Sequence, residues 1–284
     1  MSLTQHSNRA GGSTDHGADI VFDGIGKVFV TPELKAFTAV DGVDLSVEPG
    51  SFVSIIGPSG CGKSTLLNMV AGLMEPTSGE VRYRGVPVTS VNTDVGYMTQ
   101  KDNLLPWRTV TANVRIPLEI SGSHSRSTQR AMVRDVLERV GLAGFEDRYP
   151  AELSGGMRKR VALARSLVYN PNTLLMDEPF GALDAQLRVS LQAQLLALWE
   201  RDHKTVLFVT HDIEEAILLA DRVVVFGTNP GHVKHVEQIT LDRPRELTKA
   251  RTSPETVEIM DRLAALIEPA PVESGESVPE GQVE

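Results

Sequence analysis

The 284-residue sequence predicts an α/β fold in which a buried sheet carries polar residues at one edge. Three observations lead to this prediction. An apolar stretch, residues 51–56, runs into a glycine-rich loop that opens directly into a helical pattern. Two later apolar stretches end at Glu178 and at His211. Between residues 101 and 150 the pattern changes to one that favours helices, which we interpret as a helical insertion in the α/β core.

The composition is that of an ordinary globular protein. Hydrophobic residues make up 41% and charged residues 23% of the sequence, and no apolar run approaches the roughly 18 residues that span a bilayer. The first residues lack the basic and apolar regions of a secretory signal, and Cys61 is the single cysteine, so we expect a cytoplasmic protein without disulfides. The net charge of −9 argues against a nucleic-acid partner.

The glycine-rich loop has the pattern of a phosphate-binding site. Its three glycines let successive backbone N–H groups turn inward, and the helix that follows adds the positive end of its dipole. Lys63 can then reach the terminal phosphates of a nucleotide, and the Ser64 hydroxyl can ligate Mg²⁺. The loop matches G-x-x-x-x-G-K-S and comprises Gly57, Pro58, Ser59, Gly60, Cys61, Gly62, Lys63, Ser64 and Thr65.

Two phenylalanines precede this loop. Phe29 or Phe37 could pack against a nucleotide base, and core packing explains either one equally well. After them, residues 43–47 alternate as a strand does, and a turn at Pro49-Gly50 leads into the apolar stretch before the loop. These two strands either form a hairpin or part into different sheets.

A second candidate anion site lies at a later helix start. Ser154 is well suited to cap a helix that runs until Asn170-Pro171 stops it. Gly155 and Gly156 follow the cap although glycine destabilises helices, and they leave the first N–H groups uncovered. An ordinary N-cap would explain the serine alone.

Polar residues at the ends of the later strands complete the candidate site. Ligands collect at the carboxyl ends of the strands in open α/β sheets, so Asp177 can hold Mg²⁺ and Glu178 can polarise an attacking water. His211 ends a strand at the same edge, where its ring can meet a γ-phosphate. Asp212 and Glu215 are spaced as in a capping box at the start of the next helix.

Together these segments resemble the ATP-binding subunit of an ABC transporter. The resemblance covers roughly residues 18 to 230, and the signature departs from the family only in having Met157 where Gln is commonest. The motifs follow in the family's order: Walker A from Gly57 to Thr65, a Q-loop at Gln100, the signature Leu153-Ser154-Gly155-Gly156-Met157, Walker B from Leu174 to Glu178, a D-loop ending at Asp184, and the switch His211.

The resemblance implies the fold of an ABC ATPase, a P-loop NTPase core sheet with an N-terminal antiparallel β subdomain and a helical insertion. Residues 18–230 would form the ATP-binding domain, with its helical subdomain at about residues 101–165. Residues 231–267 would be a C-terminal extension. The tails, residues 1–17 and 268–284, are expected to be disordered because they are polar or rich in Pro, Glu, Ser and Gly.

The resemblance also implies a head-to-tail homodimer that closes on ATP and Mg²⁺. Each ATP would lie between the Walker A loop of one copy and Ser154, Gly155 and Gly156 of the other. Asp184 would join the two sites.

Roles at the nucleotide follow from the same resemblance. Phe29 is favoured over Phe37 for stacking on adenine, and Gln100 would sense both Mg²⁺ and the attacking water. The catalytic candidates are therefore Glu178, His211 and Gln100, and the metal candidates are Ser64, Gln100 and Asp177.

The segment after Gln100 is similar to that of the nitrate, sulfonate and taurine importer group. Leu104, Leu105 and Trp107 are apolar where the family docks a permease coupling helix, and simple packing of the helical insertion is the alternative. The resemblance implies an ATPase at the cytoplasmic face of the cell membrane that energises uptake of a small anion. Its partners would be transmembrane permease subunits and, indirectly, an extracytoplasmic solute-binding protein.

Two other functions fit an ABC protein. A soluble ATPase acting on chromosomes would separate the Walker A loop from the signature by a long coiled coil, and the sequence has no sustained heptads there. Ribosome-type members usually carry tandem cassettes, whereas this chain has one. An exporter subunit is disfavoured, though weakly, by Leu105-Pro106-Trp107.

Overall fold

The structure is a computed structural model that describes residues 19–32, 34–181 and 183–267. The two tails predicted to be disordered lie outside the described residues. None of the helices in the described part is long and apolar enough to cross a membrane.

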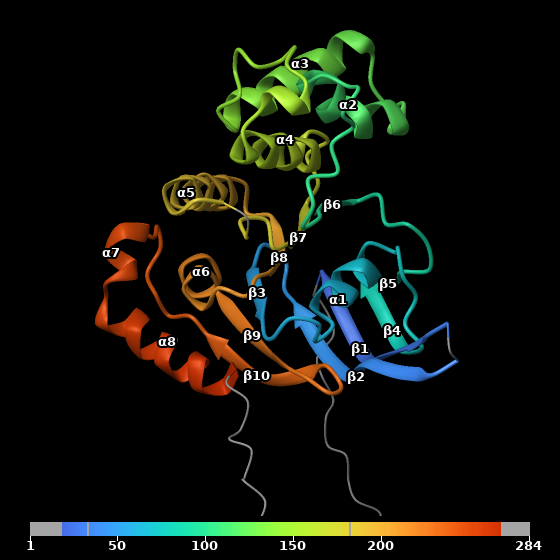
Figure 1. The fold of residues 1–284 in the computed structure, drawn as a ribbon, viewed down its shortest axis with the longest axis vertical. Coiled ribbons are helices and arrows are strands. Elements are labelled where there is room, and N and C mark those ends of the chain that lie inside the picture. Colours follow the sequence, from blue (N-terminus) through green and yellow to red (C-terminus); the bar gives the residue numbers. More distant parts are fainter. Residues whose placement is uncertain (1–18, 33, 182, 268–284) are drawn as a thin grey trace, which may run out of the picture.

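Two sheets organise the described part of the chain (Figure 1). A four-stranded antiparallel sheet has the order β2-β1-β4-β5, and a six-stranded sheet has the order β10-β9-β3-β8-β7-β6. In the larger sheet every pairing is parallel except that of β10 with β9. The strands are β1 (Ile20–Val30), β2 (Ala36–Val47), β3 (Phe52–Ile56), β4 (Ser78–Tyr83), β5 (Val86–Pro87), β6 (Val95–Met98), β7 (Thr173–Asp177), β8 (Thr205–Val209), β9 (Arg222–Gly227) and β10 (His232–Gln238).

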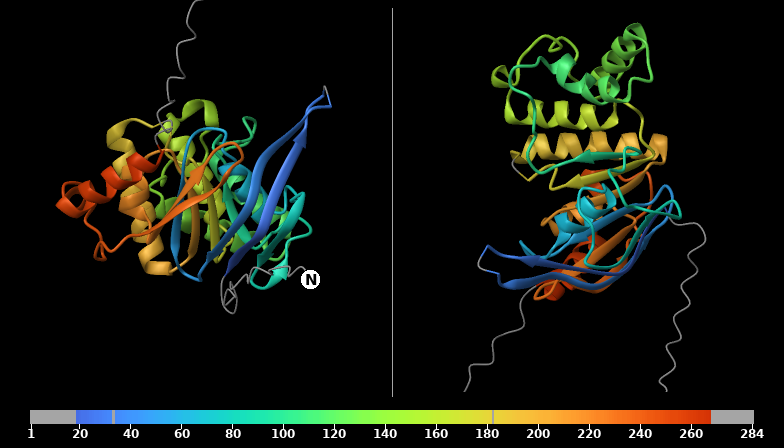
Figure 2. Two further views of the ribbon diagram at one scale, coloured as in Figure 1. Left: turned by 90° about the horizontal axis from the view of Figure 1, so that it is seen from below. Right: turned by 90° about the vertical axis from the view of Figure 1, so that its right-hand side faces the viewer.

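The helices form layers on the larger sheet. α2, α3 and α4 gather at one end of the molecule, and α5 lies between this group and the sheet (Figures 1 and 2). α8 packs against α6 and β9. The helices are α1 (Lys63–Val70), α2 (Val110–Ser121), α3 (Arg126–Arg139), α4 (Gly155–Leu167), α5 (Ala185–Asp202), α6 (Ile213–Leu219), α7 (Leu247–Arg251) and α8 (Pro254–Ile267), with a 3-10 turn at Pro150–Glu152.

The strand before the glycine-rich loop is buried on both faces, as its continuous apolar run predicts. Phe52 and Ile56 point into the cluster formed with the helices α2 to α8. Val53 and Ile55 point into a second cluster, which α1 and the four-stranded sheet complete. Because side chains alternate along a strand, this one strand joins the two hydrophobic cores.

The two sheets settle the choice that the sequence left open between a hairpin and divergent strands. β2 pairs with β1, whereas β3 pairs with β8 and β9. The hairpin alternative is therefore wrong, and the turn at Pro49-Gly50 carries the chain from one sheet to the other.

Helix α3 begins earlier than its apolar periodicity indicates. The apolar positions predict a helix at residues 131–140, but α3 starts at Arg126 because the Ser125 hydroxyl accepts a hydrogen bond from the backbone N–H of Thr128. Gln129 in this first part is buried and donates to the carbonyl oxygens of Leu118 and His124. A buried polar residue of this kind is invisible to a count of apolar positions.

The order of the larger sheet places the functional strands side by side. β3, β8 and β7 are parallel neighbours, so their carboxyl ends meet at one edge. Val209 is level with Ile55 on one side and with Asp177 on the other. The loop after β3, the carboxylates after β7 and His211 after β8 are thereby brought together.

Candidate active site

The glycine-rich loop joins the end of β3 to the start of α1. Gly62 caps α1 with a left-handed backbone, φ 97°, and no side chain accepts a bond from the first turn. A Cβ at this position would come within 2.5 Å of Cγ2 of Val40, so only glycine fits. The first N–H groups of α1 are thus not taken by a cap side chain, as a phosphate-binding helix start requires.

Lys63 lies inside the curve of this loop. It is 5% exposed, and its ammonium donates to the carbonyl oxygens of Gly57 and Pro58, each at 2.8 Å. The Cys61 sulfur is 3.6 Å from the same ammonium, and Cys61 is itself buried. The positive charge of Lys63 is therefore held against the carbonyl oxygens of the loop itself.

A hydroxyl and a carboxylate meet beside the loop. Ser64 donates from its Oγ to Oδ1 of Asp177 at 3.0 Å. Burial raises the pKa of the Asp177 carboxyl, and the neighbouring Glu178 carboxylate adds to this effect, while the Ser64 bond opposes it. Two hard oxygen donors, one of them a poorly solvated carboxylate, fit a divalent cation such as Mg²⁺.

Glu178 is the meeting point of the candidate catalytic residues. Gln100 donates from Nε2 to Oε2 of Glu178 at 2.9 Å, and Nδ1 of His211 lies 3.5 Å from the same oxygen. Glu178 itself has a left-handed backbone, φ 44°, and its N–H donates to the carbonyl oxygen of Val209. Three segments far apart in the sequence thus converge on one carboxylate oxygen.

Both phenylalanines face the same cavity. Phe29 and Phe37 are cross-strand partners on β1 and β2, and Lys27 lies 5.5 Å from the centroid of the Phe29 ring. The structure therefore makes both rings available to a base. The cavity, of about 350 Å³, is lined by Phe29, Phe37, Ala39, Ser59, Gly60, Gly62, Lys63, Ser64, Thr65, Gln100 and Glu178.

The signature segment does not line this cavity. Ser154 caps α4 by accepting a bond from the N–H of Met157 at 3.3 Å, and both Ser154 and Gly155 are exposed. Gly156 is buried, and a Cβ there would lie 1.8 Å from Cδ2 of Leu187 on α5. The sequence suggested that both glycines keep N–H groups uncovered, but packing against α5 gives Gly156 a separate reason to be glycine.

Asp184 has a role within its own chain. Its Oδ1 accepts a bond from the N–H of Leu187 at 2.9 Å, so it caps α5, the helix that packs on Gly156. Ala182 of the predicted D-loop lies outside the described residues.

The capping box expected after His211 is half wrong. Asp212 does cap α6, since its Oδ1 accepts a bond from the N–H of Glu215 at 3.1 Å. Glu215 does not reach back to the Asp212 N–H, which donates instead to the Thr210 hydroxyl. The Glu215 carboxylate is buried against the Thr210 hydroxyl and the side-chain amide of Gln192, and this burial raises its pKa.

Sequence reasoning missed the residues that support Gln100. Lys159 donates to the Gln100 carbonyl oxygen, and Arg165 donates to the carbonyl oxygens of Asp102 and Asn103. A basic run on a helix normally indicates a solvated face, so only the fold reveals these contacts.

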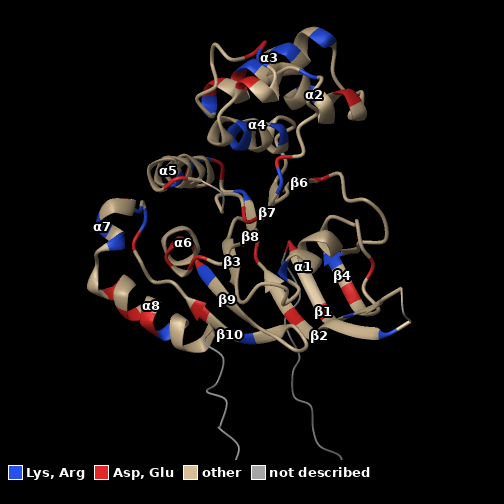
Figure 3. Cartoon of the chain, viewed as in Figure 1, with Lys and Arg blue, Asp and Glu red and all other residues tan. Residues whose placement is uncertain are grey.

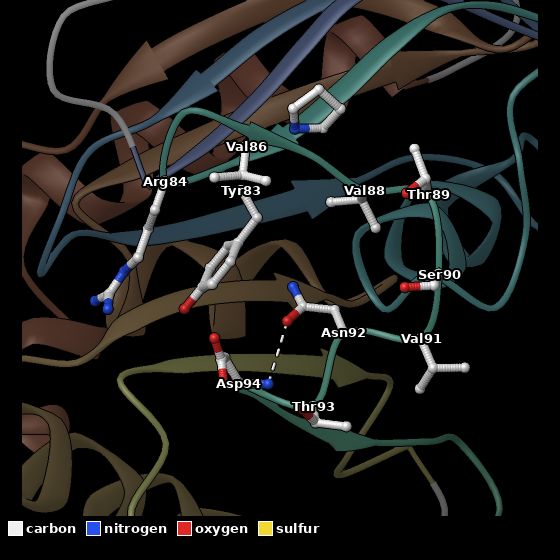
Figure 4. Close-up of a pocket in the computed structure, with 11 residues that line it drawn as sticks. Tyr83, Arg84, Val86, Val88, Thr89, Ser90, Val91, Asn92, Thr93 and Asp94 are labelled. Atoms are coloured by element: carbon white, nitrogen blue, oxygen red, sulfur yellow. Dashed lines mark hydrogen bonds between the residues drawn. The ribbon is translucent and has the colours of Figure 1, made fainter.

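A separate hollow of about 320 Å³ lies between the β4–β5 hairpin and the loop before β6 (Figure 4). Tyr83, Arg84 and Asp94 line it, and Asn92 accepts a bond from the Asp94 N–H through its side-chain oxygen. It shares no lining residue with the cavity at Lys63.

Comparison with known proteins defines the class of this chain. Residues 40–181 match the family described as ABC transporter. The nitrate import ATP-binding protein NrtD of Synechococcus elongatus is 46% identical over 227 residues, which cover 79% of this chain and 82% of NrtD. The aliphatic sulfonates import ATP-binding protein SsuB of Bacillus cereus is 42% identical over 229 residues, covering 81% of this chain and 89% of SsuB.

Solved structures agree with these relatives. The ABC transporter cassette MJ0796, solved as a dimer and also as a dimeric post-hydrolysis state with ADP and Pi, matches with a TM-score of 0.71. The match has 34% identity and covers 78% of this chain and all of MJ0796. This chain belongs to the ABC transporter family. Within that family it is an ATP-binding, ATP-hydrolysing subunit with the P-loop NTPase fold.

Proposed function

We propose that this chain drives the import of a small anion, such as nitrate or an organic sulfonate, by hydrolysing ATP at the cytoplasmic face of the membrane. The observation that carries the catalytic part is the convergence of Gln100 and His211 on one oxygen of Glu178, beside Lys63 and Ser64. The names of the relatives NrtD, for nitrate import, and SsuB, for import of aliphatic sulfonates, support a small anion as the imported solute.

The cavity at Lys63 accommodates the nucleotide. The Lys63 ammonium exchanges its bonds to Gly57 and Pro58 for bonds to phosphate oxygens, and the free N–H groups at the start of α1 bind the rest of the triphosphate. Phe29 and Phe37 stack on or flank the adenine.

Water activation falls to Glu178. Its carboxylate accepts the proton of the attacking water, while Gln100 and His211 orient that water and the γ-phosphate. Ser64 and Asp177 would hold Mg²⁺, with Gln100 as a further oxygen donor, and the ion would supply positive charge that offsets the charge developing on the phosphates. The products are ADP and inorganic phosphate.

A second copy of the chain completes the site. Ser154 and Gly155 are exposed and do not line the cavity at Lys63 of their own chain, so they are free to bind the nucleotide of a partner in a head-to-tail homodimer. Gly156 supports this surface from beneath through its contact with Leu187, and Asp184 orders the start of α5 next to it. The dimeric MJ0796 structures support this arrangement.

The permease subunits dock beside α2. A groove of about 720 Å³ lies between α2 and β6, and Trp107 nearby in the sequence is 72% exposed. Leu104 is partly buried and packs against the hydrophobic core, so Trp107 is the more accessible anchor. The groove suits a short apolar helix and is lined chiefly by Tyr97, Ile116, Pro117, Ile120, Arg165 and Tyr169.

Reconstitution tests the proposal. The chain is assembled in proteoliposomes with the permease and the solute-binding protein encoded beside it, and ATP hydrolysis and uptake are measured with nitrate, taurine and an alkanesulfonate. We expect one of these anions to stimulate hydrolysis and to accumulate. Hydrolysis that ignores all three, with no uptake, would contradict the importer function while leaving the ATPase assignment intact.

A further inference from the structure

The signature helix α4 holds the segment that follows Gln100. Lys159 on α4 is 5% exposed, and its ammonium donates to the Gln100 carbonyl oxygen. The same ammonium lies 3.1 Å from Oδ1 of Asp102. These are its two partners among the described residues, one from the main chain and one carboxylate.

Two neighbouring arginines reinforce this contact. Nε of Arg158 lies 3.5 Å from the second carboxylate oxygen of Asp102. Arg165, at the far end of α4, donates to the carbonyl oxygens of Asp102 and Asn103 at 2.7 and 2.8 Å. α4 carries basic side chains and no acidic ones (Figure 3), and it uses three of them on one short segment.

Burial makes the Lys159 contact rigid. A buried ammonium is strongly disfavoured unless its hydrogen bonds are satisfied and a countercharge is close. Lys159 therefore cannot leave Gln100 and Asp102 without leaving a buried charge uncompensated, which is strongly unfavourable. At this point α4 and the Gln100 segment move together.

A continuous path then joins the signature to the catalytic carboxylate. Ser154 is the N-cap of α4, and Lys159 lies further along the same helix. The Lys159 ammonium holds the main chain of Gln100. The Gln100 side chain donates to Glu178. A displacement of α4 at its exposed end must therefore change the position of the Gln100 amide at Glu178.

We propose that Lys159 is a positioning residue that couples the signature end of α4 to Gln100. When the partner's nucleotide fixes Ser154, Lys159 fixes the Gln100 main chain, and the Gln100 side chain then aligns water at Glu178. This inference rests on the roles proposed above for Ser154, Gln100 and Glu178, and it adds Lys159 as the residue that links them.

The chain contains a matched control for Lys159. Lys204 is also buried, with 7% exposure, and its ammonium donates to the Asn170 side chain and to the Pro171 carbonyl oxygen. It makes no contact with the Gln100 segment. Replacing either lysine by methionine removes a buried ammonium while keeping most of the side-chain volume, so Lys204→Met reports the general structural effect of that change.

The experiment compares Lys159→Met with Lys204→Met in the full chain. Three quantities are measured: kcat for ATP hydrolysis, the Kd for a fluorescent ATP analogue, and the thermal midpoint. We expect Lys159→Met to lower kcat about ten- to hundredfold with an unchanged Kd, because misplacing a water-orienting group affects turnover and not binding. Lys204→Met should keep a kcat near that of the wild type, with a similar shift in thermal midpoint.

A second comparison tests the pairing itself. Asp102→Asn alone should also lower kcat, since it leaves the Lys159 charge with neutral partners only. The double variant Lys159→Met/Asp102→Asn should lose no more than the larger single effect, because the two residues act through one contact. Multiplicative losses would contradict this.

The outcomes separate this inference from the function on which it rests. Equal kcat values for Lys159→Met and Lys204→Met, or a loss of ATP affinity in Lys159→Met, would overturn the positioning role. Full turnover by Glu178→Gln would instead overturn the proposed catalytic site, and the coupling would then have no target.

Discussion

The two helix starts that bear the nucleotide motifs differ in how they are finished. The start of α1 has no side-chain cap and faces a cavity together with Lys63 and Gln100. The start of α4 is capped by the Ser154 hydroxyl, and Gly156 behind it packs on Leu187. The start of α1 is open to a ligand in the cavity of its own chain. The start of α4 already has its cap and is exposed at Ser154 and Gly155.

This difference agrees with the proposal that each subunit contributes two unlike halves, one to its own nucleotide site and one to the site of its partner. The cradle, by which we mean the glycine-rich loop from Gly57 to Thr65 at the start of α1, lies at one edge of the parallel sheet. The sheet brings Asp177, Glu178 and His211 to the same edge. The signature half depends on how α4 sits on α5 and on the Gln100 segment. Changes in the two halves should therefore alter different measured quantities.

Removing the carboxylate at the cradle should give the largest effect. We expect Glu178→Gln to lower kcat by about 10²- to 10⁴-fold, because the general base for the attacking water is lost. ATP binding and ATP-driven dimerisation should persist, since no phosphate contact is removed. Single-turnover hydrolysis and size-exclusion chromatography with ATP measure these, and normal turnover would remove Glu178 from the catalytic role.

The cradle lysine should affect binding rather than turnover alone. Lys63→Ala is expected to weaken ATP binding to the monomer about ten- to hundredfold, the range that follows from losing a charge-assisted hydrogen bond of about 1.5–3 kcal/mol. Ser154→Ala serves as the control from the other half. Ser154→Ala should leave the affinity of the monomer for ATP unchanged, and it should lower the free energy of unfolding by about 1 kcal/mol because the N-cap is lost. Reduced ATP affinity in both variants would mean that the two halves are not separate.

A single methyl group tests the contact behind the signature. Gly156→Ala places a Cβ 1.8 Å from Leu187, so we expect overpacking to lower the free energy of unfolding by about 1–3 kcal/mol. Gly155→Ala is the matched control, since its Cβ would meet only the end of the Arg158 side chain at 3.7 Å. It should be neutral or stabilising by up to about 1 kcal/mol through helix propensity.

Urea unfolding measures both variants. Adding Leu187→Ala to Gly156→Ala should recover part of the loss, because it makes room for the new methyl group. Equal stability of the two glycine variants would show that Leu187 does not constrain Gly156.

The smallest expected effect is on stability and concerns Glu215, whose carboxylate is bonded to Thr210, the residue before His211. Burial raises the pKa of Glu215 in the folded chain above its ordinary value of 4.5, so the neutral acid is the form that folding favours. Its contribution is complete below the unfolded pKa and is lost as pH rises through the folded pKa. Glu215→Gln has no titration, and its amide can pair with Gln192, whose side-chain oxygen has no partner.

We therefore expect the stability of Glu215→Gln relative to the wild type to increase with pH. Denaturant midpoints at several pH values between about 4 and 8 check this sign. A difference that is independent of pH would contradict the shifted pKa of Glu215.

Local patterns predicted the cradle well because its chemistry is contiguous. The buried strand, the loop that ends at Lys63 and the helix after it follow one another in the chain, and each has a short-range signal. The two strands that lead to Glu178 and to His211 were predicted for the same reason. The assignment of roles to these residues stays a prediction.

Other features could not be predicted from the sequence because they depend on contacts between segments distant in the chain. Glu215 fits a capping box by spacing, yet its carboxylate turns to Thr210 and Gln192 on neighbouring elements. Leu104 is an apolar residue at a position where an exposed anchor was expected, yet it is partly buried against the core. No local pattern distinguishes these outcomes.

The sequence by itself determined the α/β class, the order of the nucleotide motifs and the phosphate cradle, because glycine freedom, strand period and helix starts act over a few residues. Only the tertiary structure decided that Phe29 and Phe37 are cross-strand partners, that Gly156 packs on Leu187 and that Lys159 holds the main chain of Gln100. Such contacts join segments that the chain keeps far apart, so their free energy exists only when the whole fold has formed.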